Sequence, residues 1–322
     1  MSPEVVQRRS MIVLACLAGL ALACLAAFMT IGAKGSWSFV LSFRGMRLAA
    51  LLIVAYAIAV STVLFQTITD NRILTPSIMG FDALYVLLQT LLVFLFGANT
   101  LSAVEPRLMY VVEIGVMVGF SLLLYRFLFG SDRHNIHLVV LVGIVLGGLF
   151  RSLSGFMQRV INPDDFVVLQ DRLFASFNVT DSTLIGISVL LIALATLAIW
   201  RISHTFDVLT LGRSGAISLG IDHRVTTMKI LALVAMLVSI STALVGPVTF
   251  FGLLVANLAY LVMPTARHRY VLPAAVLIAV ICLVGGQTVL ERVFAFDTAL
   301  SIIIEFAGGL FFILFLLKGR LR

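Results

Sequence analysis

The sequence predicts an all-α membrane protein with about ten transmembrane helices, and three observations support this prediction. Of the 322 residues, 61% are hydrophobic and only 11% are charged, whereas soluble domains carry about 25% charged residues. The apolar residues gather into segments of the length that a bilayer requires, about 20 residues per helix. The loops between them are mostly short. No soluble core could bury so much apolar surface in so short a chain, so we expect lipid to be the solvent.

Ten segments are long and apolar enough, or nearly so, to form these helices. They cover residues 11–31, 46–68, 80–97, 107–129, 137–159, 182–202, 226–245, 250–264, 271–290 and 299–317. Arg8 and Arg9 precede the first segment, as in a signal peptide, but it is long enough to span and has no clean cleavage site. We therefore interpret it as a retained span, and we expect a single transmembrane domain over residues 1–322.

Two connecting segments are longer than the others. Residues 161–181 are acidic and polar and are predicted to hold short interfacial helices. Residues 202–225 have the pattern of a compact amphipathic element rather than a linker.

The basic residues predict the orientation. If the N-terminus is cytoplasmic and the spans alternate, fourteen of the 22 Lys and Arg residues lie on the inner side and seven on the outer side. This bias favours a cytoplasmic N-terminus and a cytoplasmic C-terminus, with an even number of spans. In a soluble protein the net charge of +7 would suggest nucleic acid, but here it fits anionic headgroups, and we expect no nucleic-acid partner.

Two stretches interrupt the helical pattern, at residues 70–80 and 246–252. In the first, Pro76 disfavours helix at the preceding residue and Gly80 permits close backbone approach. The second begins with Gly246 and Pro247 and has no charge, so we expect it to stay at membrane depth. Irregular backbone is tolerated there where protein covers it or where it lines a cavity, and discontinuous helices are common in transporters. An ordinary tight turn is the alternative at each place.

Five motifs in this sequence resemble those of the FecCD-type family, the permease subunits of ATP-binding-cassette (ABC) importers for iron–siderophore complexes, haem and cobalamin. The first is F-R-G-M-R from residue 43, followed by Gln66, where the family has L-R-x-P-R and a Gln. The second is N-R-I-L-T-P-S-I-M-G from residue 71 (family N-P-L-x-x-P-x-x-L-G), and the third is L-G-R-S-G-A-I-S-L-G-I from residue 211 (family L-G-x-x-x-A-x-x-L-G). The fourth is G-P-V-T-F-F-G-L-L-V-A-N from residue 246 (family G-P-I-G-F-V-G-L-x-x-P-H), and the fifth is H-R-Y-V-L-P from residue 268 (family H-R-x-x-L-P). The resemblance covers nearly the whole chain and implies the type II ABC importer permease fold.

Some positions depart from the family motifs. The family's Pro-His is Ala256-Asn257 here, and Tyr260 stands where a basic residue is common. Phe81-Asp82 follows the first break, a variant that resembles the branch importing ferric catecholate or mixed-ligand siderophores. In such systems two different permeases often form a heterodimer, so the resemblance favours a second permease subunit, with a homodimer as the alternative.

The resemblance implies three groups of functional residues. Outer arginines would dock a periplasmic or lipoprotein siderophore-binding protein: Arg44, Arg47 and Arg292. A cytoplasmic segment at about 205–224 would form coupling helices for the ATPase: Leu211, Gly212, Ser214, Ala216, Leu219, Gly220 and Ile221. Gate and pathway residues would be Gln66, Asn71, Leu74, Asp82, Gly246, Pro247 and Phe250, with residues 131–137 as a second cytoplasmic gate.

Polar residues inside spans are functional candidates by default. They are Gln66, Asp82, Gln89, Glu113, Arg151, Gln287 and Glu305. Asp82 and Glu113 could instead pair with Arg151 in a structural network.

The chain has no G-x-x-x-x-G-K-[ST] phosphate loop, so partner ATPase subunits would bind ATP and Mg²⁺ and hydrolyse the ATP. We therefore expect a non-catalytic, multi-pass subunit in the bacterial inner (cytoplasmic) membrane, with no cofactor of its own. No metal site is predicted, because no carboxylate or Cys completes a set around His134 and His137.

Other functions remain to be weighed. An intramembrane aspartyl protease needs a second buried Asp opposite Asp82, and no other Asp lies within a predicted span. An ion-coupled secondary transporter would work without an ATPase, and the coupling motif disfavours it. Within the resembling family, haem or cobalamin could replace the ferric siderophore as cargo.

Overall fold

The structure is a computed structural model that describes residues 3–32, 36–129, 136–178, 181–293 and 300–317. These residues form helices and loops without a strand. Eight helices are long and apolar enough to cross a membrane. They are α1 (Pro3–Thr30), α2 (Trp37–Thr69), α3 (Phe81–Ser102), α4 (Pro106–Phe129), α5 (Ile136–Gln158), α7 (Ser182–Ile202), α10 (His223–Val245) and α12 (His268–Val293). The all-α, multi-pass architecture is thus confirmed.

Two further apolar helices are shorter. They are α11 (Phe251–Val262) and α13 (Leu300–Leu317). At 1.5 Å per residue, the 12 residues of α11 extend about 18 Å, less than the roughly 30 Å hydrocarbon core. The eighth predicted segment, 250–264, therefore contains a helix too short to cross the core by itself.

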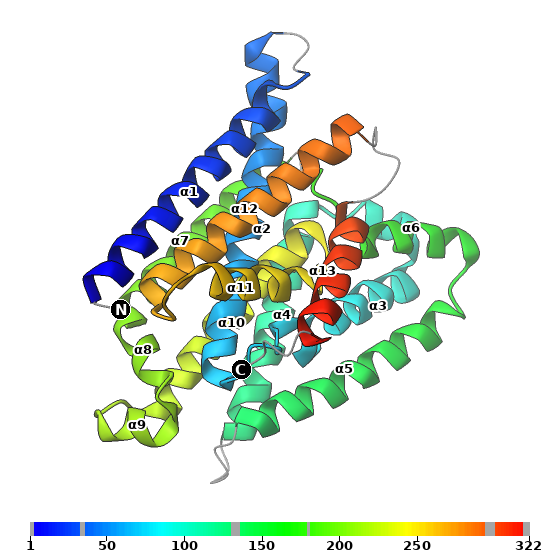
Figure 1. The fold of residues 1–322 in the computed structure, drawn as a ribbon. Coiled ribbons are helices and arrows are strands. Elements are labelled where there is room, and N and C mark those ends of the chain that lie inside the picture. The colour runs from blue at the N-terminus through cyan, green and yellow to red at the C-terminus, as the bar shows by residue number, and fades with distance from the viewer. Residues whose placement is uncertain (1–2, 33–35, 130–135, 179–180, 294–299, 318–322) are drawn as a thin grey trace.

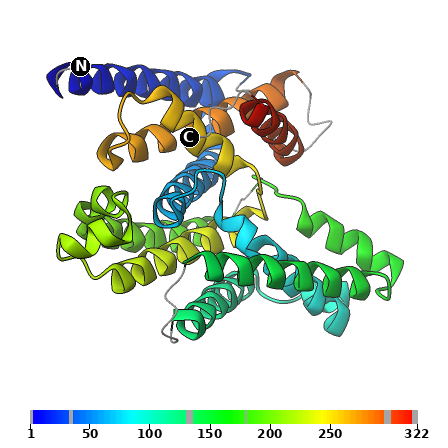
Figure 2. The same cartoon turned by 60° about the horizontal axis from the view of Figure 1, so that its bottom comes forward.

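The longer connections hold short helices, as predicted. Residues 161–181 contain α6 (Pro163–Leu173), and residues 202–225 contain η2 (Ser203–Thr205), α8 (Phe206–Leu209) and α9 (Gly212–Ser218). In both views α8 and α9 lie towards the same end as the N-terminal end of α1, and α6 lies towards the other (Figures 1 and 2).

Helix α2 forms the centre of the bundle. It packs against α10 on one side and α12 on the other, and α1 covers α12 (Figures 1 and 2). Its inward residues are wholly buried, among them Leu51, Leu64 and Phe65. By contrast, α7 exposes Leu190, Leu197 and Trp200, as expected for side chains that face lipid.

The start of α2 differs from the sequence prediction. The helix begins at Trp37, nine residues before the predicted span at 46, so Arg44 lies on the same helix as Arg47 and not in the preceding loop. The apolar count misses this extension because the extra turns carry charge. They are nonetheless held by contacts with the end of α1, described below.

The first break follows α2. Asp70 adopts a left-handed conformation (φ 48°), Pro76–Met79 form the 3₁₀ helix η1, and Gly80 has φ 86° before α3 begins. A Cβ atom on Gly80 would lie 2.9 Å from the Cα of Gly147 in α5. Glycine is required there by both its backbone conformation and the space available. The prediction of a broken helix is confirmed at this place.

The second break separates α10 from α11 at Gly246, whose φ is 97°. The connection after α6 runs along it: the backbone N–H of Ser176 donates to the Val245 carbonyl (2.7 Å), and a Cβ on Gly246 would lie 3.0 Å from the Cα of Ala175. Protein therefore covers Gly246, which is buried, as the argument from unsatisfied backbone requires.

Candidate functional site

The first break borders a cavity of about 360 Å³ at the α8 end of the bundle, lined by Gln66, Thr67, Asn71, Arg72, Thr210 and Tyr260 among others. Gln66 donates from Nε2 to the Arg72 carbonyl (2.7 Å), and Asn257 donates from Nδ2 to the same oxygen (3.1 Å). Asn71 Oδ1 accepts the backbone N–H of Ile73 (2.9 Å). These bonds hold an irregular backbone in one shape, as local side-chain bonds do in turns.

Asn257 and Tyr260, which depart from the family motifs, meet Arg72 beside this cavity. The Arg72 guanidinium lies 4.5 Å from the centre of the Tyr260 ring, and Asn257 holds the Arg72 carbonyl. Cations are attracted to the face of an aromatic ring. The departures therefore form one local unit, a relationship that sequence motifs 185 residues apart do not reveal.

The two breaks meet at Asp82. Its Oδ2 accepts a hydrogen bond from the Thr249 hydroxyl (3.2 Å). Between the breaks lies a cavity of about 20 Å³, lined by Ser61, Thr62, Thr75, Ser77, Asp82, Ser241, Thr242 and Thr249 among others. This is room for about one water molecule among several hydroxyl groups. Among the predicted pathway residues, Asp82 thus lies at the junction of the two breaks, whereas Gly246 lines the pocket that contains Glu113.

The other predicted pathway residues lie nearby or apart. Leu74 is half-buried at the first break and packs against the core that includes Phe65. Phe250 is 40% exposed and contacts α13, because a Cβ on Gly308 would lie 3.1 Å from its Cβ. The predicted second gate at 131–137 falls largely outside the described residues.

The alternative in which Asp82 and Glu113 pair with Arg151 in a structural network does not match the structure. Among the ion pairs of the described residues, none joins these three side chains. Asp82 faces Thr249, Glu113 accepts a hydrogen bond from Gln89, and Arg151 is exposed. Asp82 lies seven residues before Gln89, the partner of Glu113, which is about 10 Å along α3. The carboxylates of Asp82 and Glu113 therefore lie at different places in the structure.

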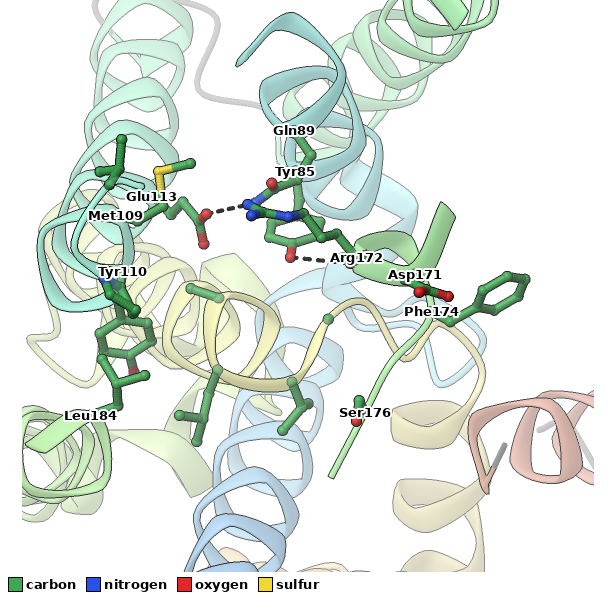
Figure 3. Close-up of a pocket in the computed structure, with 16 residues that line it drawn as sticks. Tyr85, Gln89, Met109, Tyr110, Glu113, Asp171, Arg172, Phe174, Ser176 and Leu184 are labelled. Atoms are coloured by element: carbon green, nitrogen blue, oxygen red, sulfur yellow. Dashed lines mark hydrogen bonds between the residues drawn. The ribbon is translucent and has the colours of Figure 1, made fainter. Parts of the chain in front are cut away.

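Glu113 lies in a pocket of about 330 Å³ between α3, α4, α6, α7 and α10 (Figure 3). Glu113 and Gln89 are almost fully buried, and the Arg172 side chain points towards them from α6. The Tyr85 hydroxyl donates to the Arg172 carbonyl (3.5 Å), and Tyr110 shares a hydrogen bond with Ser188 (2.7 Å). Sequence analysis missed Tyr85, although its spacing from Asp82 and Gln89 places all three on one face of α3.

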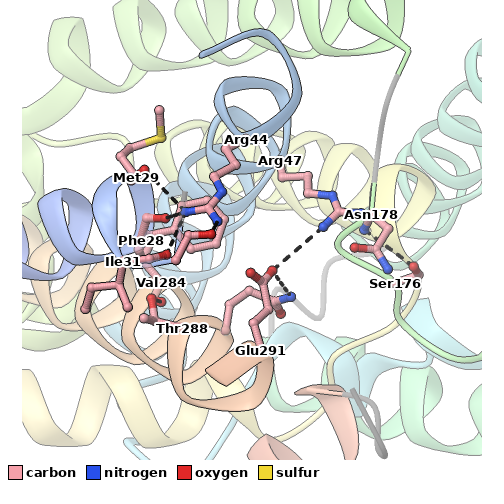
Figure 4. Close-up of polar contacts among 12 residues, drawn as sticks. Phe28, Met29, Ile31, Arg44, Arg47, Ser176, Asn178, Val284, Thr288 and Glu291 are labelled. Atoms are coloured by element: carbon pink, nitrogen blue, oxygen red, sulfur yellow. Dashed lines mark hydrogen bonds and ion pairs between the residues drawn. The ribbon is translucent and has the colours of Figure 1, made fainter. Parts of the chain in front are cut away.

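Two of the arginines predicted to dock the binding protein, Arg44 and Arg47, have partners within the chain (Figure 4). Arg44 donates to the carbonyls of Phe28 (2.8 Å), Ile31 (3.0 Å) and Gly32 (2.9 Å) at the end of α1. A cation there satisfies terminal carbonyls and complements the helix dipole. Arg44 therefore fastens α2 to α1.

Arg47 and Arg292 are placed differently. Arg47 Nη1 lies 3.8 Å from Glu291 Oε1, and its guanidinium stacks 4.3 Å from the centre of the Phe43 ring. Arg292 is exposed, with its guanidinium against Gly32. Of the three arginines predicted for docking, Arg292 is the most exposed.

The predicted coupling segment forms two short helices, α8 and α9. Gly212, the first residue of α9, and Gly220, which follows its end, both have φ 80°, a conformation that favours glycine. Ala216 is buried, whereas Leu211, Ile217 and Leu219 are 62%, 54% and 61% exposed. Ser214 is also exposed and Ile221 is half-buried. The backbone turns sharply at both glycines, and the segment presents an apolar surface at the end of the molecule.

Comparisons with known proteins agree with this architecture. The chain matches the FecCD transport family over residues 10–318. It is 46% identical over 310 residues to the petrobactin import system permease protein YclO of Bacillus subtilis, covering 96% of this chain and 98% of that protein. Two permease proteins of the petrobactin import system of Bacillus anthracis, FatC and FatD, are 39% and 26% identical over 86% of this chain, covering 78% and 80% of those proteins.

A solved structure shares the fold. A metal-chelate type ABC transporter in an inward-facing conformation superposes with a TM-score of 0.83 at 20% identity, covering 96% of this chain and 99% of that one. The resemblance drawn from five motifs is thus confirmed. The chain belongs to the FecCD transport family.

Proposed function

We propose that this chain carries a ferric siderophore of the catecholate type across the bacterial inner membrane. As a FecCD member it is a non-catalytic, multi-pass permease subunit of an ABC importer, with ATP hydrolysed by separate partners. The observation that carries the choice of cargo is the 46% identity, over 96% of the chain, to a petrobactin permease. Petrobactin is a siderophore of the catecholate type.

The topology that we propose has ten spans with both termini in the cytoplasm. The two shorter apolar helices, α11 and α13, complete the ten, α11 together with the irregular backbone of the second break that precedes it, and the bias of basic residues supports the orientation. The N-terminal end of α1 and the coupling segment lie towards the same end of the bundle, as this topology requires.

Each partner has a surface. The exposed Leu211, Ile217 and Leu219 suit a cleft in an ATPase subunit, because exposed apolar patches mark interaction sites. That ATPase uses ATP and Mg²⁺. At the other end, Arg292 and Arg47 dock a periplasmic or lipoprotein siderophore-binding protein by charge. FatC and FatD, two permeases of one system, support a heterodimer with a second permease.

The pathway that we propose runs past the two breaks. Gln66, Asn71 and Leu74 form the cytoplasmic gate, and Asp82 joins it to the second break at Gly246, Pro247 and Phe250. Side chains that close by packing suit this task, since a gate must open without breaking strong bonds.

Uptake by a bacterial strain that lacks this gene tests the assignment. Restoring the gene is expected to restore uptake of radiolabelled iron supplied as ferric petrobactin, with an intact ATPase gene as a requirement. Restored uptake of haem or cobalamin without ferric siderophore would overturn the cargo assignment. Restored uptake without the ATPase would instead favour a secondary transporter.

A further inference from the structure

Three residues far apart in the sequence form a continuous hydrogen-bonded chain beside the first break. His268, the first residue of α12, shares a hydrogen bond through Nδ1 with Asp207 Oδ1 of α8 (2.7 Å), and its backbone N–H donates to the same oxygen (2.9 Å). Through Nε2 it shares a hydrogen bond with the Thr67 hydroxyl of α2 (2.7 Å). We propose that this Asp207–His268–Thr67 chain, the histidine relay, is the positioning link that carries movement of the coupling helices to the cytoplasmic gate.

Two of the three relay side chains are buried, and Asp207 is half-exposed. His268 and Thr67 are 4% and 8% exposed. The wholly buried ring of Phe206 in α8 packs edge-on against the imidazole, with 5.6 Å between ring centres. Two hydrogen bonds from one residue to a single carboxylate oxygen, with a ring contact from the adjacent residue, fix the start of α12 against α8. Displacement of α8 must therefore move α12 or break these bonds.

The hydrogen bonds of Thr67 determine which nitrogens of His268 must donate a proton. The Thr67 hydroxyl also lies 2.8 Å from the Val63 carbonyl, which can only accept. When Thr67 donates there, Nε2 must donate to Thr67, and Nδ1 must donate to the Asp207 carboxylate. Both nitrogens then carry protons, and His268 and Asp207 form an ion pair. A neutral imidazole requires Thr67 to turn its proton away from Val63.

The far end of the relay lies at the gate. Thr67 lines the 360 Å³ cavity together with Gln66, Asn71 and Tyr260, and α2 ends two residues later, at Thr69. The relay thus links the coupling segment, which is proposed to contact the ATPase, with the irregular backbone of the first break. Neither the glycine pattern of the coupling segment nor the motif at residue 268 indicated this link.

The test uses the complete transporter reconstituted in lipid vesicles. Thr67→Val removes a hydrogen bond and Asp207→Asn removes a charge, each with little change of shape. His268→Phe removes the hydrogen bonds of the imidazole but keeps a ring against Phe206. Each is expected to lower transport per ATP hydrolysed about fivefold or more, the lower range of energetic coupling between sites. Thr69→Val is the matched control, because Thr69 bonds only to carbonyls of its own helix and its replacement should leave the ratio unchanged.

The three variants should also be non-additive. Thr67→Val combined with His268→Phe is expected to match His268→Phe alone, because both remove the same link. Parental transport per ATP in Thr67→Val, or a double variant whose defect multiplies the single ones, would overturn the relay.

The relay rests on the function proposed above, so a second measurement is chosen that does not depend on which cargo is transported. Ile73, which lines the gate cavity, is replaced by Cys, and its labelling by an impermeant maleimide is followed with and without ATP. ATP is expected to change the labelling rate in the parent and not in Thr67→Val. An equal ATP response in both would contradict the relay even if the cargo assigned here were wrong.

Discussion

Asp82 on α3 accepts a hydrogen bond from Thr249 (3.2 Å) and thereby joins two helix breaks that lie 167 residues apart in the sequence. This contact makes the breaks one unit around a small polar cavity, and the bond is worth about 1.5–3 kcal/mol if the carboxylate is charged.

Removing this contact is expected to impair transport more than folding. Thr249→Val should lower the stability of the purified subunit by about 1–3 kcal/mol, because the half-buried Asp82 carboxylate loses this hydroxyl donor, and should reduce uptake several-fold. Thermal unfolding in detergent and vesicle uptake measure the two effects. Thr288→Val, whose hydroxyl bonds only to Val284 of its own helix, is the control. Equal behaviour of the two variants would argue against a joined unit.

The close approach of η1 to α5 predicts different effects at neighbouring glycines. An added Cβ at Gly147 would lie 3.0 Å from the Cα of Gly80, whereas one at Gly148 would meet nothing within 4 Å. Gly147→Ala should therefore lower the unfolding temperature. Gly148→Ala should leave it unchanged or raise it, since Ala favours helix by about 1 kcal/mol. A reversed order in thermal unfolding would mean that α5 does not pack as described.

Arg44 is expected to stabilise the fold, whereas Arg47 and Arg292 are expected to dock the binding protein. Arg44→Ala leaves the carbonyls at the end of α1 without their partner and should lower stability by about 1–3 kcal/mol with little change in salt-dependent docking. The double variant Arg47→Glu with Arg292→Glu should weaken docking of the binding protein strongly at low salt and less at high salt. Docking titrations at two ionic strengths decide this, and equal affinity of variant and parent at low salt would refute the docking role.

The coupling segment predicts an uncoupled variant. Gly220 has φ 80°, so Gly220→Arg strains the turn and places bulk beside the exposed Leu219. ATP hydrolysis by the assembled transporter should then continue while uptake falls. Gly220→Ala, which adds strain without bulk, should show a smaller defect of the same kind. Unchanged coupled uptake in Gly220→Arg would contradict the proposed ATPase surface.

Features that depend on neighbouring residues could be predicted from the sequence, whereas contacts between residues far apart in the sequence could not. Span composition and the Pro and Gly residues at 76, 80, 246 and 247 are local, and they located the bundle and both breaks. Contacts between distant residues have no local pattern. Pairing of Asp82 with Arg151 was one alternative, yet Thr249 contacts Asp82, and Arg44 bonds carbonyls of α1. Spacing along α3 could have indicated the shared face of Asp82, Tyr85 and Gln89, but not the residues opposite it.

The central claim is that this chain, with partner subunits, imports a ferric catecholate siderophore at the expense of ATP. Vesicles containing the permease pair and its ATPase, supplied with binding protein, test it most directly. The account predicts that labelled ferric petrobactin accumulates only with hydrolysable ATP and that an imposed sodium or proton gradient cannot replace it. Accumulation driven by such a gradient without ATP, or ATP-driven accumulation of haem or cobalamin alone, would contradict it.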